Sequence, residues 1–203
     1  MFEEEIKRRD MNELKPVILL YNEEKEEGEM EIELKLNEAM DIGTTYPKPN
    51  VNKEEIKEYL WKGKYISKGE ENCKLIIGRK EYEYIFWEGI CLKKEAFRGK
   101  EIGIRKERME SELDELLIRL GLNERERNDF IVYWMIKLSE MNHVKVTVCN
   151  SEYDTTIVPM KVKGFDKVHR VMMKFESVDT IEGLQTMEEV ERIERPTGKY
   201  VIE

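Results

Sequence analysis

The clearest pattern in the chain is a strict alternation of apolar and charged residues over positions 29–36. Met30, Ile32, Leu34 and Leu36 occupy every second position, and Glu29, Glu31, Glu33 and Lys35 stand between them. Successive side chains of a strand point to opposite faces of a sheet. The pattern therefore predicts a half-buried strand with one face in water.

Other segments have the composition of strands. The short apolar run VILLY follows Lys15-Pro16 and predicts a buried strand. Further strands are predicted at Trp61–Ile66, Lys74–Ile77, Glu81–Trp87, Val144–Cys149, Thr155–Val162, Val168–Phe175 and Tyr200–Ile202. Glu81–Trp87 is apolar on both faces, which is typical of a strand in the middle of a sheet. Tyr46–Asn50 contains two prolines and predicts a break in regular structure.

The apolar period changes to that of a helix around residues 107–120. Its apolar residues fall on one helical stripe: Met109, Leu113, Leu116, Leu117 and Leu120. Gly121 suits the end of this helix. Asn123, with Glu126 three residues later, predicts a capping box at the start of a second helix.

Some segments are less clearly defined. FIVYWMI at 130–136 has a composition that also suits a strand, but the cap before it and the polar KLSEMN after it favour a mostly buried helix. Residues 53–60 and 186–194 have local helix potential. Residues 2–14 predict either a short charged helix or a flexible arm.

This order of elements predicts an α+β fold of mostly antiparallel β-sheet layers, sandwich-like, with a central helical hairpin packed on one face. A length of 203 residues suits one domain. We therefore expect an N-terminal arm at 1–14 and a single α+β domain at 15–203.

Several features bear on the compartment. No stretch approaches eighteen apolar residues, so no transmembrane helix is expected, and MFEEEIKRRD lacks the apolar segment of a signal peptide. Cys73, Cys91 and Cys149 are far apart and odd in number, which fits a reducing compartment. The expected location is the cytoplasm.

Charge is distributed unevenly along the chain. The net charge of −9 argues against simple electrostatic adhesion to nucleic acid. Residues 92–108, however, hold seven Lys/Arg against three Asp/Glu, and residues 160–174 hold five against one, between two acidic ends. These basic segments fit either solvated loops or a binding surface.

The residues give little support for catalysis. His143 and His169 are the only histidines, no CxxC or HExxH motif is present, and the phosphate-binding glycine loops and the GxSxG motif are missing. We therefore expect no metal, no cofactor and no small-molecule substrate. Glu88 fits an acid with a raised pKa in apolar surroundings, or a strand-end carboxylate bonded to a loop.

Aromatic residues near the basic stretches offer a second binding signal. They are Tyr46, Trp61, Tyr65, Trp87, Phe97 and Phe165. Aromatic rings interleaved with cations can stack bases or grip a phosphate backbone, although aromatic residues on strands are usually core.

Four segments carry a family resemblance. They are KPVILLY at Lys15–Tyr21, TYPKPN at Thr45–Asn50, YIFWEG at Tyr84–Gly89 and LGLNERERNDFIVYW at Leu120–Trp134. In this order they resemble a widespread, largely uncharacterised family. Its members carry a Lys-Pro-Val-Ile-Tyr-Leu-Tyr type strand, a Tyr-Pro turn, a Phe/Tyr-Trp-Glu strand end and a Leu-Gly-Leu-Asn-Glu-Arg-Glu helix start.

The chain departs from that family in places. Leu19 and Asn22 stand where Tyr and Pro are expected, and the chain stops at Glu203 where relatives commonly run on to Trp-Gly-Gly. The resemblance therefore does not extend any role of that tail to this chain.

Within this family the acid-ended chain, rich in lysine and methionine, is similar to the microsporidian dormancy factors. Those are ribosome hibernation proteins that occupy the tRNA exit site of idle ribosomes. The resemblance implies a non-catalytic partner of the ribosome, bound to its RNA and proteins. The basic residues implied to face ribosomal RNA are Lys93, Lys94, Arg98, Lys100, Arg105, Lys106, Lys161, Lys163, Lys167 and Arg170. A small hydrolase that uses Glu88 and a protein-binding adaptor are the alternatives.

Overall fold

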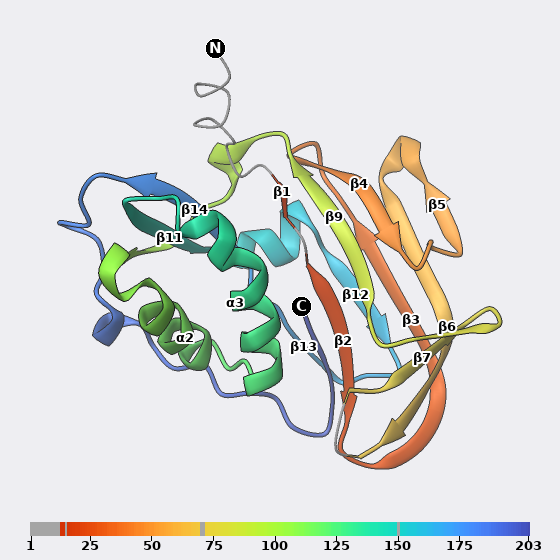
Figure 1. Cartoon of the computed structure of the whole chain (residues 1–203). Coiled ribbons are helices and arrows are strands. Elements are labelled where there is room, and N and C mark those ends of the chain that lie inside the picture. Colours follow the sequence, from red (N-terminus) through yellow and green to blue (C-terminus); the bar gives the residue numbers. More distant parts are fainter. Residues whose placement is uncertain (1–12, 15, 70–71, 150) are drawn as a thin grey trace.

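The computed structural model describes residues 13–14, 16–69, 72–149 and 151–203, and in them the chain forms three sheets and a helical hairpin (Figure 1). The fold is α+β with mostly antiparallel sheets, as the sequence predicts. Two six-stranded sheets form a sandwich, and the helices lie beside it with a small third sheet.

The first sheet is built around β9. It contains β1 (Glu13–Leu14), β9 (Ile85–Cys91), β2 (Val17–Asn22), β15 (Lys199–Ile202) and β13 (Lys167–His169) in that order. The strand β4 (Met40–Tyr46) pairs with β9 on its other side. Strand β9 is therefore interior, as its two apolar faces predict. Only β13 and β15 run parallel in this sheet, among the described residues.

The second sheet holds the alternating strand. Its order is β12 (Met160–Lys163), β3 (Lys25–Lys35), β6 (Glu58–Lys68), β7 (Lys74–Ile77) and β8 (Lys80–Tyr82), and β5 (Val51–Lys53) pairs with β6. Met30, Ile32 and Leu34 of β3 are buried, and the charged residues between them face outward. The prediction for this strand is confirmed.

The sandwich core lies between these two sheets. Trp87 of β9 and Trp61 of β6 are both fully buried in one hydrophobic cluster. Burial at about 25 cal/mol per Å² of apolar surface makes such large rings major contributors to stability.

The helical hairpin has a separate core. Helices α2 (Met109–Arg119) and α3 (Glu124–Leu138) pack on a three-stranded sheet of β10 (Gly99–Ile104), β11 (His143–Cys149) and β14 (Met173–Val178). The stripe predicted on α2 is buried there with Trp134 of α3. Gly121 has a φ of 83°, so it closes α2 in the left-handed region where glycine carries no Cβ penalty.

The start of α3 also agrees with the sequence, but its burial does not. Asn123 and Glu126 form both hydrogen bonds of the predicted capping box. The expectation of a mostly buried helix is wrong, because Val132 is 73% exposed and Ile136 is 74% exposed. Only one side of α3 meets α2 and the sheet, so apolar residues on its other side face solvent.

Two predicted strands contain breaks. Glu81–Trp87 is divided between β8 and β9, because the chain leaves the second sheet after Tyr82 and enters the first at Ile85. Val168–Phe175 is likewise divided between β13 and β14, which belong to different sheets.

Three further segments differ from prediction. Thr155–Val162 begins as a π-helix at Tyr153–Ile157, and only β12 is extended. The helix potential at 53–60 yields a short 3-10 turn, Glu54–Ile56, that Lys57 ends with a φ of 51°. The potential at 186–194 yields the single turn Met187–Glu189. Such short pieces are decided by tertiary pairing more than by local propensity.

The expected arm at residues 1–14 lies outside the described residues except for β1, which pairs with Gly89 and Ile90 of β9. Among the described residues, none of the helices has the length and apolar character needed to cross a membrane.

Candidate nucleic-acid interface

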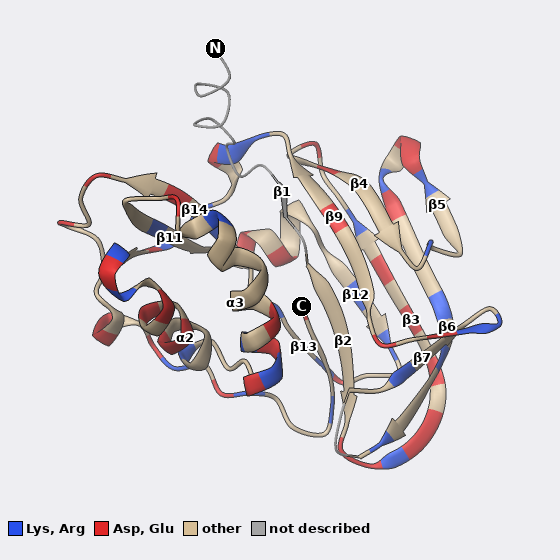
Figure 2. Ribbon diagram, in the orientation of Figure 1, with Lys and Arg blue, Asp and Glu red and all other residues tan. Residues whose placement is uncertain are grey.

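The basic segment at 92–108 is divided by β10. Lys93, Lys94, Arg98 and Lys100 lie around the 3-10 turn η2 (Lys94–Ala96) and the start of β10, whereas Arg105 and Lys106 follow its end (Figure 2). Six extended residues span roughly 20 Å. The basic segment therefore forms two groups of residues, one at each end of β10.

Lys93, Arg98 and Lys100, before and at the start of β10, are exposed and make contacts at the surface, whereas Lys94 is half-buried. Lys93 Nζ lies 3.4 Å from Glu38 Oε1, and Lys100 Nζ lies 3.1 Å from Glu191 Oε2. Both carboxylates are more exposed than their lysines. Arg98 Nε donates to the carbonyl of Glu95. Exposed pairs of this kind contribute little to stability, so a phosphate can replace the carboxylate at small cost.

After β10, Arg105 is tied into the fold through its side chain and backbone, whereas Lys106 is exposed and makes a backbone contact. The guanidinium of Arg105 pairs with Glu112, and its backbone N–H donates to the same carboxylate at 2.9 Å. Lys106 donates its backbone N–H to His143 Nδ1 at 3.2 Å. Glu112 is buried. Arg105 therefore holds the start of α2 in place.

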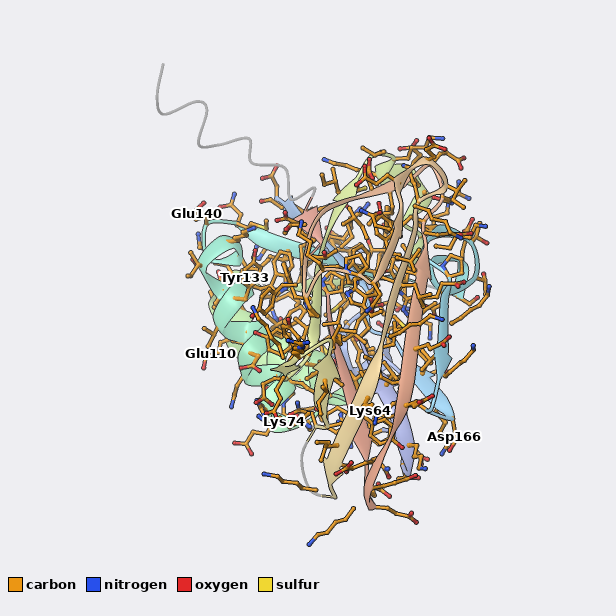
Figure 3. The ribbon with its side chains drawn as sticks, turned by 90° about the vertical axis from the view of Figure 1, so that its right-hand side faces the viewer. Lys64, Lys74, Glu110, Tyr133, Glu140 and Asp166 are labelled. Atoms are coloured by element: carbon orange, nitrogen blue, oxygen red, sulfur yellow. The ribbon has the colours of Figure 1, made fainter. Side chains whose placement is uncertain are left out.

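The lysines of β12 form a cross-strand charge ladder. Lys161 Nζ lies 3.0 Å from Glu33, and Lys163 Nζ lies 2.8 Å from Glu31, which also pairs with Lys62 of β6. The carboxylates are those of the wet face of β3. Figure 3 shows Lys64 on this same sheet, away from the helices that carry Glu110 and Tyr133.

The last two predicted residues differ from each other. Lys167 is exposed and donates to the carbonyl of Thr197 at 3.2 Å. Arg170 is buried, with its guanidinium paired to the buried Glu203 and stacked 4.6 Å from the ring centre of Tyr153. The prediction that Arg170 faces RNA is wrong for this fold, because its charge is used to neutralise Glu203 inside the protein.

Most of the predicted aromatic residues belong to the core. Five of the six are buried: Trp61, Tyr65, Trp87, Phe97 and Phe165. Tyr46 alone of the six is exposed, at 62%. Sequence reasoning missed Tyr84, which is 41% exposed. A signal was present, since Tyr84 is out of phase with the buried residues Ile85 and Trp87.

A buried polar cluster around Glu126 joins the helices to the first sheet. Tyr21 Oη donates to Glu126 at 2.6 Å, and Arg195 donates to both oxygens of that carboxylate at 2.6 and 2.9 Å. The guanidinium of Arg195 also lies over the rings of Tyr21 and Tyr200. Sequence reasoning assigned Glu126 a capping role alone, since its partners are far away in the chain.

This cluster shifts the pKa of its members in opposite directions. Burial would raise the pKa of Glu126, but the hydrogen bonds from Arg195 and Tyr21 outweigh it and lower that pKa. Burial, with help from the Glu126 carboxylate, raises the pKa of Tyr21 well above its usual value. Glu126 is therefore held ionised at neutral pH.

Glu88, the residue named for the hydrolase alternative, lies in an interior strand of the first sheet. Glu88 lies on β9 opposite Thr44 of β4, and a Cβ added at Gly43 would be 2.9 Å from its carboxylate. The β4 neighbours of Glu88 are thus a hydroxyl and a glycine. No group of three or more His, Cys, Asp or Glu residues suited to a metal occurs in the described ranges.

The three cysteines are free thiols. Cys73 is fully buried, and burial raises the pKa of its thiol to about 11. Burial also raises the pKa of Cys149, to about 12, and that of Cys91. At neutral pH these thiols are protonated and poorly nucleophilic.

Comparisons of the chain with protein-family models, curated proteins and solved structures found no match. The geometry of its own residues therefore carries the functional argument.

Proposed function

We propose that this protein is a non-catalytic, ribosome-associated dormancy factor of the cytoplasm that occupies the tRNA exit site of idle ribosomes. The observation that carries the proposal is the basic group Lys93, Lys94, Arg98 and Lys100 on an otherwise acidic chain, in which Lys93, Arg98 and Lys100 are exposed. The four-segment family resemblance supports it. Blocking a site on a ribosome requires shape and many modest contacts, and no chemistry.

Lys93, Arg98 and Lys100 suit a phosphate backbone because the groups that they contact lie at the surface. The carboxylates of Glu38 and Glu191 are largely in solvent, so Lys93 and Lys100 can exchange them for phosphate oxygens. The acidic segments at residues 1–40 and 175–203 are suited to basic ribosomal proteins, and they also reduce adhesion to RNA in general.

The test is co-sedimentation of the full chain with purified ribosomes over a range of salt concentrations. Binding is expected at low salt and should weaken as salt rises, because each phosphate contact releases a counterion. Substituting Lys93, Lys94, Arg98 and Lys100 by Gln should weaken binding and flatten its salt dependence by about three units of slope.

A matched variant controls for overall charge. Substituting the exposed lysines Lys25, Lys62, Lys64 and Lys68 of β3 and β6 by Gln changes the net charge equally. This variant should keep the wild-type salt slope. A wild-type chain that remains at the top of the gradient at low salt overturns the proposal.

A further inference from the structure

Two of the four family-like segments, TYPKPN and YIFWEG, meet on one exposed surface. Tyr46 ends β4, and the antiparallel pairing of β4 with β9 places it opposite Phe86. Tyr84 precedes β9 by one residue. We call Tyr46, Tyr84 and Phe86 the aromatic surface.

The alternation of β9 directs the ring of Phe86 outward, on the same face of the sheet as its partner Tyr46, and Tyr84 just before β9 is 41% exposed. Ile85 and Trp87 point into the sandwich core and are fully buried, whereas Phe86 between them is only half-buried. Phe86 is also opposite Val17 of β2, on its other side. The ring of Phe86 thus lies in a row that crosses three strands, with Tyr46 at its exposed end.

The surface is held in place by its neighbours. The ring of Tyr82 lies edge-on to that of Tyr46, with centroids 5.4 Å apart and an angle of 78°. The next residue, Pro47, accepts a hydrogen bond of 2.9 Å from the indole of Trp61. Tyr46 is 62% exposed despite these contacts, so a ring is presented to solvent on an ordered backbone.

Cations flank the aromatic surface. Lys48 follows Tyr46 by two residues, and Lys80 shares one face of β8 with Tyr82, next to Arg79 in the turn before it. All three are exposed, and within the described part of the chain none has an ion-pair partner. A ring beside unneutralised cations complements a base attached to its phosphate.

We propose that the aromatic surface binds unpaired nucleobases of single-stranded RNA, with Lys48 and the Arg79–Lys80 turn contacting phosphates. The inference rests on the proposed function and deepens it, since it names the form of RNA recognised. Stacking needs only the face of a ring. A stable protein partner, in contrast, requires burial of about 800 Å² on each side, far more than three rings with a charged rim provide.

The experiment measures binding of a fluorescent ten-nucleotide single-stranded oligouridylate to the full chain by anisotropy, with a duplex RNA of the same length for comparison. The single strand is expected to bind more tightly. The Tyr46→Ala/Tyr84→Ala variant should weaken this binding by roughly 5- to 100-fold, because the bases lose their stacking contacts with the two tyrosine rings. Tyr46→Phe/Tyr84→Phe should retain it, since the rings remain.

A control and a second readout separate the outcomes. Val132→Ala/Ile136→Ala removes exposed apolar groups elsewhere and should leave binding unchanged, and urea unfolding checks that each variant is folded. Equal binding of duplex, or full binding by the alanine variant, overturns the inference. Absence of oligonucleotide binding by the wild type also overturns it, and favours a protein partner for this surface.

Sedimentation of the same variants distinguishes the two proposals. If wild type and Tyr46→Ala/Tyr84→Ala sediment equally with ribosomes, the aromatic surface is not used there and only the inference fails. If neither the wild type nor the variant sediments with ribosomes, but the wild type binds the oligonucleotide and Tyr46→Ala/Tyr84→Ala does not, the ribosome proposal fails. The single-strand site then stands.

Discussion

At the scale of single residues, the chain uses similar side chains for opposite purposes. Arg170 and Lys163 belong to one basic segment, yet Arg170 neutralises a buried carboxylate and Lys163 belongs to a surface ladder. Their neighbours in sequence do not distinguish them. What separates them is the strand on which each lies and the face of the sheet to which it points.

This difference predicts different effects on stability. Arg170→Ala leaves Glu203 buried without its partner and should lower the free energy of unfolding by about 3–5 kcal/mol. Lys163→Ala should have a much smaller effect, because its pair is solvated. Urea unfolding of both variants measures the contrast, and equal losses would contradict it.

Glu126 predicts a second residue-scale effect. Glu126→Gln leaves Arg195 without its counter-charge and should cost about 2–3 kcal/mol, below the range for fully buried pairs because Arg195 is a quarter exposed. Glu124→Gln, on the exposed side of the same turn, is the matched control. If Glu124→Gln lowers the free energy of unfolding as much as Glu126→Gln does, the effect comes from removing a charge at the helix terminus and not from the contact with Arg195.

The pH dependence of this loss has a defined sign. The pKa of Glu126 is lower in the folded chain than its ordinary value of 4.5. Its contribution to stability is therefore fully present above about pH 4.5 and is lost as pH falls through the lower folded pKa. The stability difference between wild type and Glu126→Gln should shrink as the pH is reduced from about 6 toward 3. A difference that grows in acid would contradict this assignment.

At the scale of elements, the helical hairpin shows what local sequence can predict. Gly121, Asn123 and Glu126 are correct as helix end and capping box, because caps depend on residues within one turn. The burial of α3 was not predictable in this way. Its composition does not reveal which side meets α2.

The exposure of α3 gives a test. Val132→Lys/Ile136→Lys should change the free energy of unfolding by less than about 0.5 kcal/mol per site, since both residues face solvent. Trp134→Ala on the same helix should cost about 3–5 kcal/mol, because it opens a cavity. Thermal or urea unfolding compares them. A large loss in the lysine variant would mean that this side of α3 is covered.

The same contrast between local and long-range features applies to the surfaces and candidate sites. The strand alternation at 29–36 was predictable from a few residues, and so was the exposure of its charges. The meeting of Tyr46 with Phe86 was not, because it depends on the register of β4 against β9. The Tyr21–Glu126 contact joins residues 105 positions apart, which no local pattern encodes.

At the scale of the whole molecule, the two larger hydrophobic clusters are joined partly by polar groups, beside a small third cluster of Tyr21, Tyr200 and Ile202. The sandwich core and the core under the helices are separate clusters. Tyr21, Glu126 and Arg195 link them, as does a 2.7 Å contact between His169 Nε2 and the carbonyl of Leu120. The attachment of the helical part to the sandwich therefore depends partly on a small number of charged and hydrogen-bonded residues.

Native-state hydrogen exchange can measure this dependence. In the wild-type chain we expect slow amides of α2 and α3 to exchange with an opening free energy close to that of β3 and β6. Glu126→Gln should lower the value for the helices and leave that of the sandwich nearly unchanged. An equal decrease in both parts would show that the clusters open together.

The buried thiol of Cys73, in the sandwich, can report such openings. Only a thiolate reacts with an alkylating reagent, and a pKa of about 11 leaves roughly one thiol in ten thousand in that form at pH 7. Cys73 is thus unreactive for two reasons, because it is buried and because its thiol is protonated. The rate at which iodoacetamide modifies Cys73 should therefore report how often the sandwich opens.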